Sequence, residues 1–148
     1  CSMVMPSIPE ANVLDLFAGS GVLGLELLSR GAGHCRFNDC SRKHVAIVQE
    51  NIDHCKANDK ATVSTMDFRK CLDSLQEKMD LIILDPPYRA GYYEEAIEKI
   101  MENDLLAEGG LIVAEHLYEE ALPEEIAGLK KMKEKKYGTI GVDIYTRA

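Results

Sequence analysis

No apolar run in the sequence approaches the roughly 20 residues that a helix needs to cross a bilayer. The first residues, Cys1 to Pro6, also lack the positively charged and then apolar pattern of a secretory signal. These absences argue against a membrane-spanning or secreted protein, and we expect a cytoplasmic one. The sequence does not begin with methionine, so we expect a trimmed or partial chain.

The sequence also lacks the common spacings of metal ligands. No two of its five cysteines form a C-x-x-C pair, and its four histidines form no H-x-x-H or H-E-x-x-H pattern. Zinc sites use closely spaced ligands, and an odd number of scattered cysteines does not indicate a disulfide framework. We therefore expect reduced thiols and no metal site.

Positive charge is scarce. The 17 Lys and Arg residues are outnumbered by 25 Asp and Glu, which gives a formal net charge of −8. This balance argues against binding of nucleic acid by bulk charge alone. The charge is uneven, because acids dominate residues 92–127 and five lysines cluster within residues 130–136. Such a run is usually a solvated face, and we favour that interpretation here.

Short apolar runs alternate with helical stretches along the 148 residues, which fit one domain over residues 1–148. We predict seven strands, at residues 12–17, 35–39, 61–66, 80–84, 111–115, 130–137 and 139–146. We predict helices at residues 22–30, 42–56, 68–77 and 93–103, and a short one near 119–122. The alternation implies an α/β fold with a mostly parallel sheet and helices on both faces. Ligands of such sheets bind beyond the carboxyl ends of the strands.

Gly19, Gly21 and Gly24 form a G-x-G-x-x-G motif between the first predicted strand and helix. Glycine permits a tight turn and lets a ligand approach the backbone closely. Asp39 ends the next strand, where a carboxylate can accept hydrogen bonds from both ribose hydroxyls. These features alone also fit a nicotinamide or flavin dinucleotide. For Gly24 we favour close packing of the helix against the strand over contact with a ligand.

Three further features favour S-adenosylmethionine. Asp15 lies four positions before Gly19, where a carboxylate can attract the ligand's amino group. Asp67 follows the third strand, where it can accept from the adenine amino group, cap the helix that begins at Phe68, or do both. The third feature is Asp-Pro-Pro-Tyr at residues 85–88, which a dehydrogenase does not need. The predicted donor-binding residues are Asp15, Phe17, Gly19, Ser20, Gly21, Asp39, Asp67 and Phe68.

The tetrapeptide Asp85, Pro86, Pro87 and Tyr88 directly follows a buried apolar strand. Two prolines alone would fit a rigid turn, but the acid and the aromatic ring indicate a reactive site. An exocyclic or amide nitrogen is a poor nucleophile, because its lone pair is delocalised. Asp85 and the Pro86 carbonyl can each accept one N–H hydrogen bond, on a backbone that the prolines fix. Tyr88 offers a face for a base to stack on, so the motif predicts methyl transfer to a positioned nitrogen.

These residues resemble those of the bacterial 16S ribosomal RNA guanine-N2 methyltransferases, the small-subunit methyltransferase D type, over nearly the whole chain. The glycine loop and Asp-Pro-Pro-Tyr are shared by many amino-methyltransferases, whereas the flanking stretches are more particular to this family. The matching stretches are Val13–Ala32 (VLDLFAGSGVLGLELLSRGA), the strand that ends at Asp39, Ile83–Tyr88 (ILDPPY), Ala107–His116 (AEGGLIVAEH) and Lys135–Tyr145 (KKYGTIGVDIY).

The resemblance implies a Rossmann-like class I methyltransferase fold, with a seven-stranded sheet and an antiparallel final strand. It implies S-adenosylmethionine as the methyl donor and ribosomal RNA of an assembling small subunit as the substrate, with the guanine held by residues 85–88. Two departures stand out. The family usually has Glu where this chain has Asp39, and a basic segment rich in Arg and Gly usually precedes the first strand. No role is assigned to Glu115 and His116.

Three alternatives stay open. One is an amino-methyltransferase with another target, namely adenine N6, cytosine N4 or a protein glutamine; the glutamine enzymes usually have Asn where this chain has Asp85. Another is a non-catalytic module that binds the donor, which the net charge of −8 favours and the intact residues 85–88 oppose. The last is a dinucleotide oxidoreductase.

Overall fold

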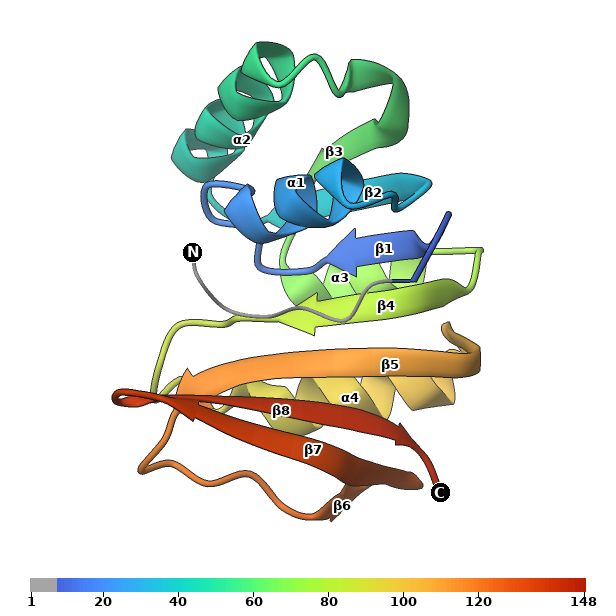
Figure 1. Ribbon diagram of the computed structural model, residues 1–148, viewed down its shortest axis with the longest axis vertical. Helices are drawn as coiled ribbons and strands as arrows, with labels where there is room; N and C mark the ends of the chain where they lie inside the picture. Colours follow the sequence, from blue (N-terminus) through green and yellow to red (C-terminus); the bar gives the residue numbers. More distant parts are fainter. Residues whose placement is uncertain (1–7) are drawn as a thin grey trace.

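The computed structural model describes residues 8–148, in which the strands form one sheet with the order β3-β2-β1-β4-β5-β8-β7-β6 (Figure 1). The strands are β1 (Asn12–Asp15), β2 (His34–Asp39), β3 (Ala61–Thr65), β4 (Met79–Leu84), β5 (Leu106–Leu117), β6 (Glu125–Ile126), β7 (Leu129–Tyr137) and β8 (Ile140–Arg147). The helices are α1 (Val22–Ser29), α2 (Arg42–His54), α3 (Phe68–Ser74) and α4 (Tyr92–Glu102), with a 3₁₀ turn at Asn58–Lys60. No helix in residues 8–148 is long and apolar enough to span a membrane.

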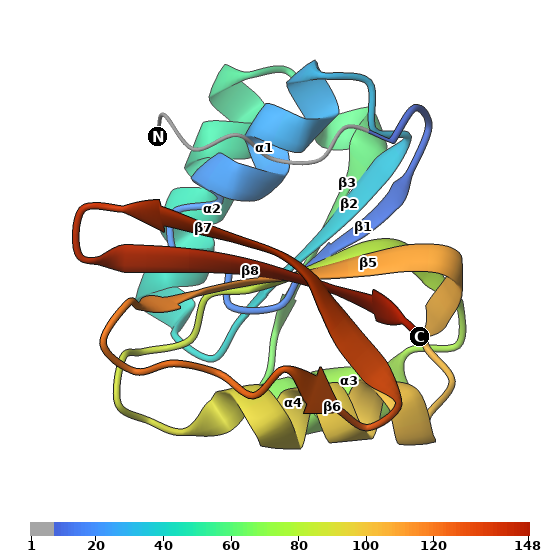
Figure 2. The same cartoon turned by 60° about the horizontal axis from the view of Figure 1, so that its bottom comes forward.

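Helices cover both faces of the sheet, as predicted. α1 and α2 pack on one face and α3 and α4 on the other (Figure 2). Because side chains alternate along a strand, β4 contributes Leu81 and Ile83 to the α1 side and Ile82 and Leu84 to the α4 side. All four are buried, which explains why β4 reads as a continuous apolar run.

Five neighbouring strands, β3, β2, β1, β4 and β5, are parallel. Their carboxyl ends therefore meet at one edge of the sheet. Because side chains alternate along each strand, four acids near this edge belong to the face of the sheet that α1 covers. These acids are Asp15, Asp39, Asp85 and Glu115. The register of the sheet thus gathers the polar residues that the sequence analysis singled out.

The carboxyl-terminal strands are antiparallel. β8 pairs with β5 and β7 in this sense, and β6 pairs with β7. The predicted α/β fold with a mostly parallel sheet and an antiparallel final strand, β8, is confirmed. All seven predicted strands are present, and the two-residue β6 adds an eighth.

Two local predictions are wrong. The segment near residues 119–122 forms a turn and an irregular stretch instead of a short helix. Four residues are too few to nucleate a stable helix, and Pro123 disfavours helical backbone at the residue before it. β5 begins at Leu106, well before the predicted residue 111. Gly109, at φ 76°, lies within an irregularity of the β4–β5 register and does not mark the start of the strand.

A buried ionic cluster links the three strands β5, β8 and β7. His116 Nε2 lies 2.9 Å and Lys131 Nζ 3.2 Å from Asp143 Oδ2. His116 Nδ1 lies 2.7 Å from the Leu117 carbonyl oxygen, so this nitrogen is the donor. Burial lowers the pKa of His116, but the hydrogen bonds that the ring donates to Asp143 and to the Leu117 carbonyl outweigh this effect and raise it. A Cβ atom at Gly141 would lie 2.8 Å from the ring, which explains a glycine at this position. The cluster fixes the end of β5.

Gly24 has a packing role, as the sequence analysis favoured. An added Cβ would collide with the Phe37 ring and lie 2.8 Å from Cys35 Sγ. We expect Gly24→Ala to destabilise the fold by about 1–3 kcal/mol through overpacking, although Ala is the better helix former by about 1 kcal/mol. Urea unfolding measures the change.

A double-mutant cycle with Phe37→Leu separates the two effects. If the collision with the Phe37 ring causes the loss, Gly24→Ala costs less in the Phe37→Leu background. A Gly24→Ala protein more stable than wild type would contradict the packing role.

Candidate active site

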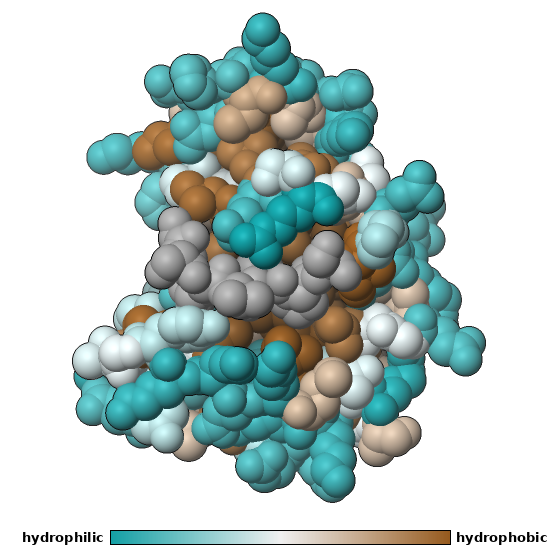
Figure 3. Space-filling model, viewed as in Figure 1, coloured by the Kyte–Doolittle hydropathy of each residue, from teal (hydrophilic) through white to brown (hydrophobic). Residues whose placement is uncertain are grey.

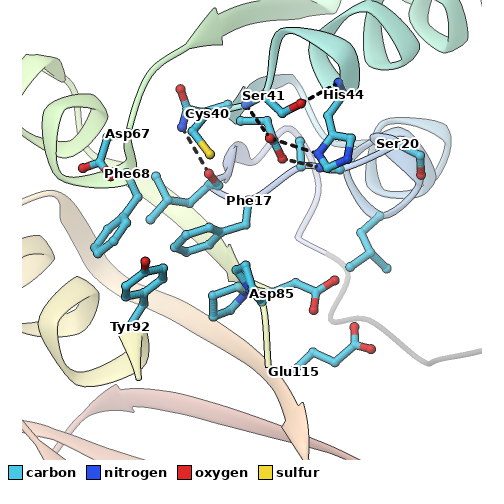
Figure 4. A pocket seen from close by; sticks show the side chains of 18 of the residues that line it. Phe17, Ser20, Cys40, Ser41, His44, Asp67, Phe68, Asp85, Tyr92 and Glu115 are labelled. Atoms are coloured by element: carbon cyan, nitrogen blue, oxygen red, sulfur yellow. Dashed lines mark hydrogen bonds and ion pairs between the residues drawn. The ribbon is translucent and has the colours of Figure 1, made fainter. Parts of the chain in front are cut away.

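A cavity of about 650 Å³ opens at the carboxyl edge of the parallel strands. It is lined by the loops that follow β1, β2, β3 and β4, and by the end of β5 (Figure 4). Its size is within the range of small-molecule sites, roughly 300–1,000 Å³. Most predicted site residues line it, namely Phe17, Gly19, Ser20, Asp39, Asp67, Phe68, Asp85, Pro86, Pro87 and Tyr88.

The glycine loop turns sharply at the cavity wall. Gly19 has φ 60°, and a Cβ added there would have no atom within 4 Å, so the strain of a side chain would be conformational. The Gly19 N–H donates to Asp39 Oδ2 at 3.0 Å. Gly21, at φ 83°, is the N-cap of α1 and is not part of the lining. The loop conformation therefore requires both glycines, whereas only Gly19 faces the cavity.

Asp39 is positioned by three donors. Besides Gly19, the Ser41 N–H donates to Asp39 Oδ1 at 2.9 Å, and His44 Nδ1 lies 3.2 Å from the same oxygen. Figure 4 shows Ser41 and His44 beside the cavity. A carboxylate has about four lone-pair sites, so Asp39 can accept further hydrogen bonds from a ligand in the cavity. Its geometry fits the predicted contact with ribose hydroxyls.

Asn38 is a structural residue of the site that the sequence analysis did not assign. Its buried side chain donates to the Leu16 carbonyl at 3.2 Å and the Met66 carbonyl at 3.0 Å, and it accepts from Ser64 Oγ at 2.8 Å. It thereby ties the end of β1 to that of β3 across β2. A polar residue inside a buried strand was the signal that could have found it.

Aromatic rings form the opposite wall of the cavity. Phe17 and Tyr92 stack with centroids 6.3 Å apart, and Phe68 lies 5.2 Å from Phe17 and 4.9 Å from Tyr92 (Figure 4). The Arg69 guanidinium covers the Phe68 ring at 4.5 Å and is held by Glu95. Sequence analysis predicted Phe17 and Phe68 but missed Tyr92, which begins α4 far along the chain.

Asp67 lies at the rim of the cavity. Its side chain accepts from the Arg69 N–H at 2.9 Å as the N-cap of α3, so the predicted capping role is confirmed. It also lines the cavity and is half-exposed. Its predicted contact with an adenine amino group stays a prediction.

Asp15 lies behind the cavity and is not part of its lining. The carboxylate is buried and accepts from the Gly24 N–H at 3.2 Å, which caps the first turn of α1. Burial raises its pKa to about 7, the Gly24 hydrogen bond opposes this, and the charges of Asp85 and Asp39 add to it. Its predicted attraction to a ligand's amino group stays a prediction, and it would have to act through the glycine loop.

Asp85 and Glu115 lie together at the end of the cavity formed by β4, β5 and residues 85–88. Pro86 is buried, whereas Tyr88 is 42% exposed and available for stacking. Leu84 pairs with Ala114, so Asp85 and Glu115 leave neighbouring parallel strands side by side, and Figure 4 shows both in the cavity wall. Burial and then the Glu115 charge raise the pKa of Asp85 to about 7. Burial also raises the pKa of Glu115.

A basic strip borders this end of the cavity. The cross-strand pairs Glu115–Val142 and Val142–Lys135 put Lys135 on the same face as Glu115, two strands away. The spacing of strands makes this about 10 Å. Lys133 lies on the same face opposite Ile144, and both lysines are exposed. Figure 3 shows the hydrophilic surface over β7 and β8.

The sheet order, its antiparallel end and a cavity at the carboxyl edge define the class I methyltransferase fold. The family model "Conserved hypothetical protein 95" matches residues 1–146. The chain belongs to this family, which includes the small-subunit ribosomal RNA methyltransferases D.

Individual relatives agree with this assignment. YlbH of Bacillus subtilis is 37% identical over 99% of this chain and 81% of its own. The Ribosomal RNA small subunit methyltransferase D of Escherichia coli K12 is 33% identical over 96% of this chain and 71% of its own. A solved structure of a conserved hypothetical protein from Streptococcus pyogenes is 38% identical and superposes with a TM-score of 0.92, covering 97% of this chain and 89% of that one.

The buried carboxyl group of Asp15 makes stability depend on pH. Its pKa rises from 3.8 to about 7 on folding, so across this window the folded chain holds a proton that the unfolded chain has lost. The free energy of unfolding therefore falls as pH rises through the window. Asp15→Asn keeps an oxygen for the Gly24 N–H without the charge. We expect the variant to lose this dependence and to be more stable than wild type at about pH 8.

Urea unfolding at several pH values tests this expectation. One pKa unit corresponds to about 1.4 kcal/mol, so the gain should be a few kcal/mol at most. Asp59→Asn is the matched control, because Asp59 is exposed in the 3₁₀ turn. Equal pH dependence of Asp15→Asn and wild type would contradict a buried, protonated Asp15.

Proposed function

We propose that the chain transfers a methyl group from S-adenosylmethionine to the exocyclic N2 amine of a guanine in small-subunit ribosomal RNA. The observation that carries the proposal is the position of the Asp85 carboxylate. It lies in the same cavity as the glycine loop and Asp39, directly after a buried strand and before Pro86. A nucleotide pocket and an acceptor for N–H groups therefore share one space.

The residues of the cavity fit the proposed donor. Asp39 offers carboxylate oxygens to ribose hydroxyls, and Gly19 lets a ligand approach the loop backbone. Phe17, Phe68 and Tyr92 offer aromatic surface, and ring faces also favour a sulfonium cation. When bound, the donor would supply a methyl group carried on a positively charged sulfur.

The chain's own residues would position the acceptor nitrogen. Asp85 accepts one N–H of the amine, the Pro86 carbonyl accepts the other, and the lone pair is left directed at the methyl group. As the new C–N bond forms and the C–S bond breaks with its electron pair on sulfur, the nitrogen becomes positive and loses a proton. Asp85 can take this proton, because its pKa of about 7 makes it a competent base near neutral pH.

RNA as substrate is supported by the relatives and by the basic strip. The Escherichia coli and Haemophilus influenzae relatives that match 96% of this chain are named as ribosomal RNA small subunit methyltransferases D. Lys133 and Lys135 can contact phosphates while Tyr88 stacks on the base. The strip is local, so the net charge of −8 does not prevent it from acting beside the cavity.

Adenine N6 is the second candidate target. A tRNA1(Val) (adenine(37)-N6)-methyltransferase of Haemophilus influenzae is 29% identical over 52% of this chain. Asp85 and Pro86 would hold an adenine amine as readily as a guanine amine. Mass spectrometry of the methylated nucleoside separates the two targets.

Asp85→Asn tests the assigned role. We expect transfer to fall by roughly 100-fold or more, because the amide can neither accept as a charged group nor take the proton. Affinity for S-adenosylhomocysteine, measured by calorimetry, should stay close to that of wild type. Transfer of labelled methyl to assembled small subunits made from unmodified 16S RNA gives the rate.

The pH profile and a second cofactor complete the test. Wild-type transfer should rise with pH up to about 7 and then level off, because Asp85 must be ionised to act. The titratable groups around it, Glu115, Tyr88 and Tyr93, supply no positive charge that would lower its pKa. NAD should not bind. Transfer by Asp85→Asn at the wild-type rate would contradict the role of Asp85, and binding of NAD alone would contradict the proposed function.

The basic strip can be tested separately. The double substitution Lys133→Ala and Lys135→Ala should weaken RNA binding and reduce the slope of log K against log salt by about 1 per lost phosphate contact. Filter binding over a range of salt concentrations measures both. Lys60→Ala with Lys78→Ala is the control, because these lysines precede β3 and β4 at the opposite edge. Equal slopes for both double variants would contradict an RNA contact on β7.

A further inference from the structure

Glu115 lies at the end of β5 where the reacting base would be held, yet it has no role in the chemistry described above. The pairing of Leu84 with Ala114 places Glu115 beside Asp85. Both side chains line the same cavity (Figure 4). The charge of Glu115 is close enough to contribute to the raised pKa of Asp85.

The carboxylates of Asp85 and Glu115 differ from the other two acids at this edge of the sheet. Within residues 8–148, neither side chain makes a hydrogen bond or an ion pair, although both are partly buried. Asp15 and Asp39, at the same edge, are satisfied by backbone N–H groups. Two neighbouring acids without donors repel each other, so the fold alone does not explain them. A ligand that presents adjacent N–H donors would satisfy both.

We propose that Glu115 selects guanine by accepting the hydrogen bond from its N1–H, while Asp85 and the Pro86 carbonyl hold the neighbouring N2 amine. This inference rests on the proposed function and names its specificity-determining residue. Guanine presents N1–H directly beside its amine. Adenine and cytosine carry a lone pair on the ring nitrogen beside theirs, which would face an ionised Glu115 and be repelled.

The structure holds the backbone of Glu115 in place, as discrimination requires. The Tyr93 hydroxyl donates to the Glu115 carbonyl at 2.5 Å. The next residue, His116, is fixed by Asp143 and by the Leu117 carbonyl. The backbone of Glu115 therefore cannot shift easily to avoid a wrong base. A carboxylate at N1–H also draws that proton and raises the electron density of the adjoining amine, which favours its attack on a methyl group.

The test replaces the guanosine that wild type methylates with 2-aminopurine riboside in a synthetic RNA. This base keeps the 2-amino group but carries a lone pair at N1. We expect wild type to lose about 100-fold in kcat/KM on the substitution, as a site built for a hydrogen-bond donor rejects a base that lacks it. Glu115→Gln can donate to N1, so its preference for guanosine should shrink to about 10-fold or less.

Glu115→Ala and Glu102→Gln are the comparison variants. Glu115→Ala should lose guanosine transfer without gaining 2-aminopurine transfer, and Glu102→Gln, exposed at the end of α4, should behave as wild type. All variants should melt no lower than wild type, because the Glu115 substitutions remove a half-buried charge, and all should keep the wild-type affinity for S-adenosylhomocysteine. Unchanged discrimination by Glu115→Gln overturns the inference alone. Failure of wild type to methylate any RNA guanosine overturns the proposed function as well.

Discussion

The site depends on an electrostatic constraint that the sheet itself creates. Parallel register and side-chain alternation bring Asp15, Asp39, Asp85 and Glu115 to one edge with the same parity. Burial raises the pKa of Asp15, and the negative charges of Asp85 and Asp39 add to this effect. Backbone N–H groups stabilise two of the four carboxylates, because Gly19 in the glycine loop donates to Asp39 and Gly24 in the first turn of α1 donates to Asp15. The other two remain open to the cavity, which is where a donor-rich ligand is best accommodated.

Two consecutive residues at the end of β2 turn this edge into a pocket. Asp39 reaches one side and holds the glycine loop through the Gly19 N–H. Asn38 reaches the other side and ties the Leu16 and Met66 carbonyls across the strand. Buried polar side chains that are fully hydrogen-bonded rigidify their surroundings. The loop after β1 is therefore fixed from both faces, and the aromatic wall that begins at Phe17 is fixed with it.

The sequence predicted those parts of the molecule that local pattern controls. Apolar runs and stretches of β-forming residues located the longer parallel strands, and Gly138 between two further stretches located β7 and β8. The glycine loop and residues 85–88 located both ends of the cavity. Contacts between distant segments were beyond its reach. Tyr92 joins Phe17 only because α4 packs beside α3. Asp15 is a second example, because it is buried behind the glycine loop and accepts a hydrogen bond from the Gly24 N–H. From the sequence alone, a carboxylate just before a glycine motif is expected to contact the ligand.

The distribution of charge is compatible with the proposed RNA substrate, although the chain as a whole is acidic. Glu115 and Lys135 lie on one face of the sheet with only β8 between their strands. A guanosine nucleotide is complementary to this arrangement. The Watson–Crick edge of its base carries two N–H donor groups, which suit a carboxylate, and its phosphate is anionic, which suits a lysine. An acidic pocket beside a basic strip is therefore complementary to a single extruded guanosine. The rest of the surface needs no positive charge for such a contact. Net charge is thus a poor guide to the proposed substrate, whereas the pairing of β5, β8 and β7 places positive charge where that substrate would need it.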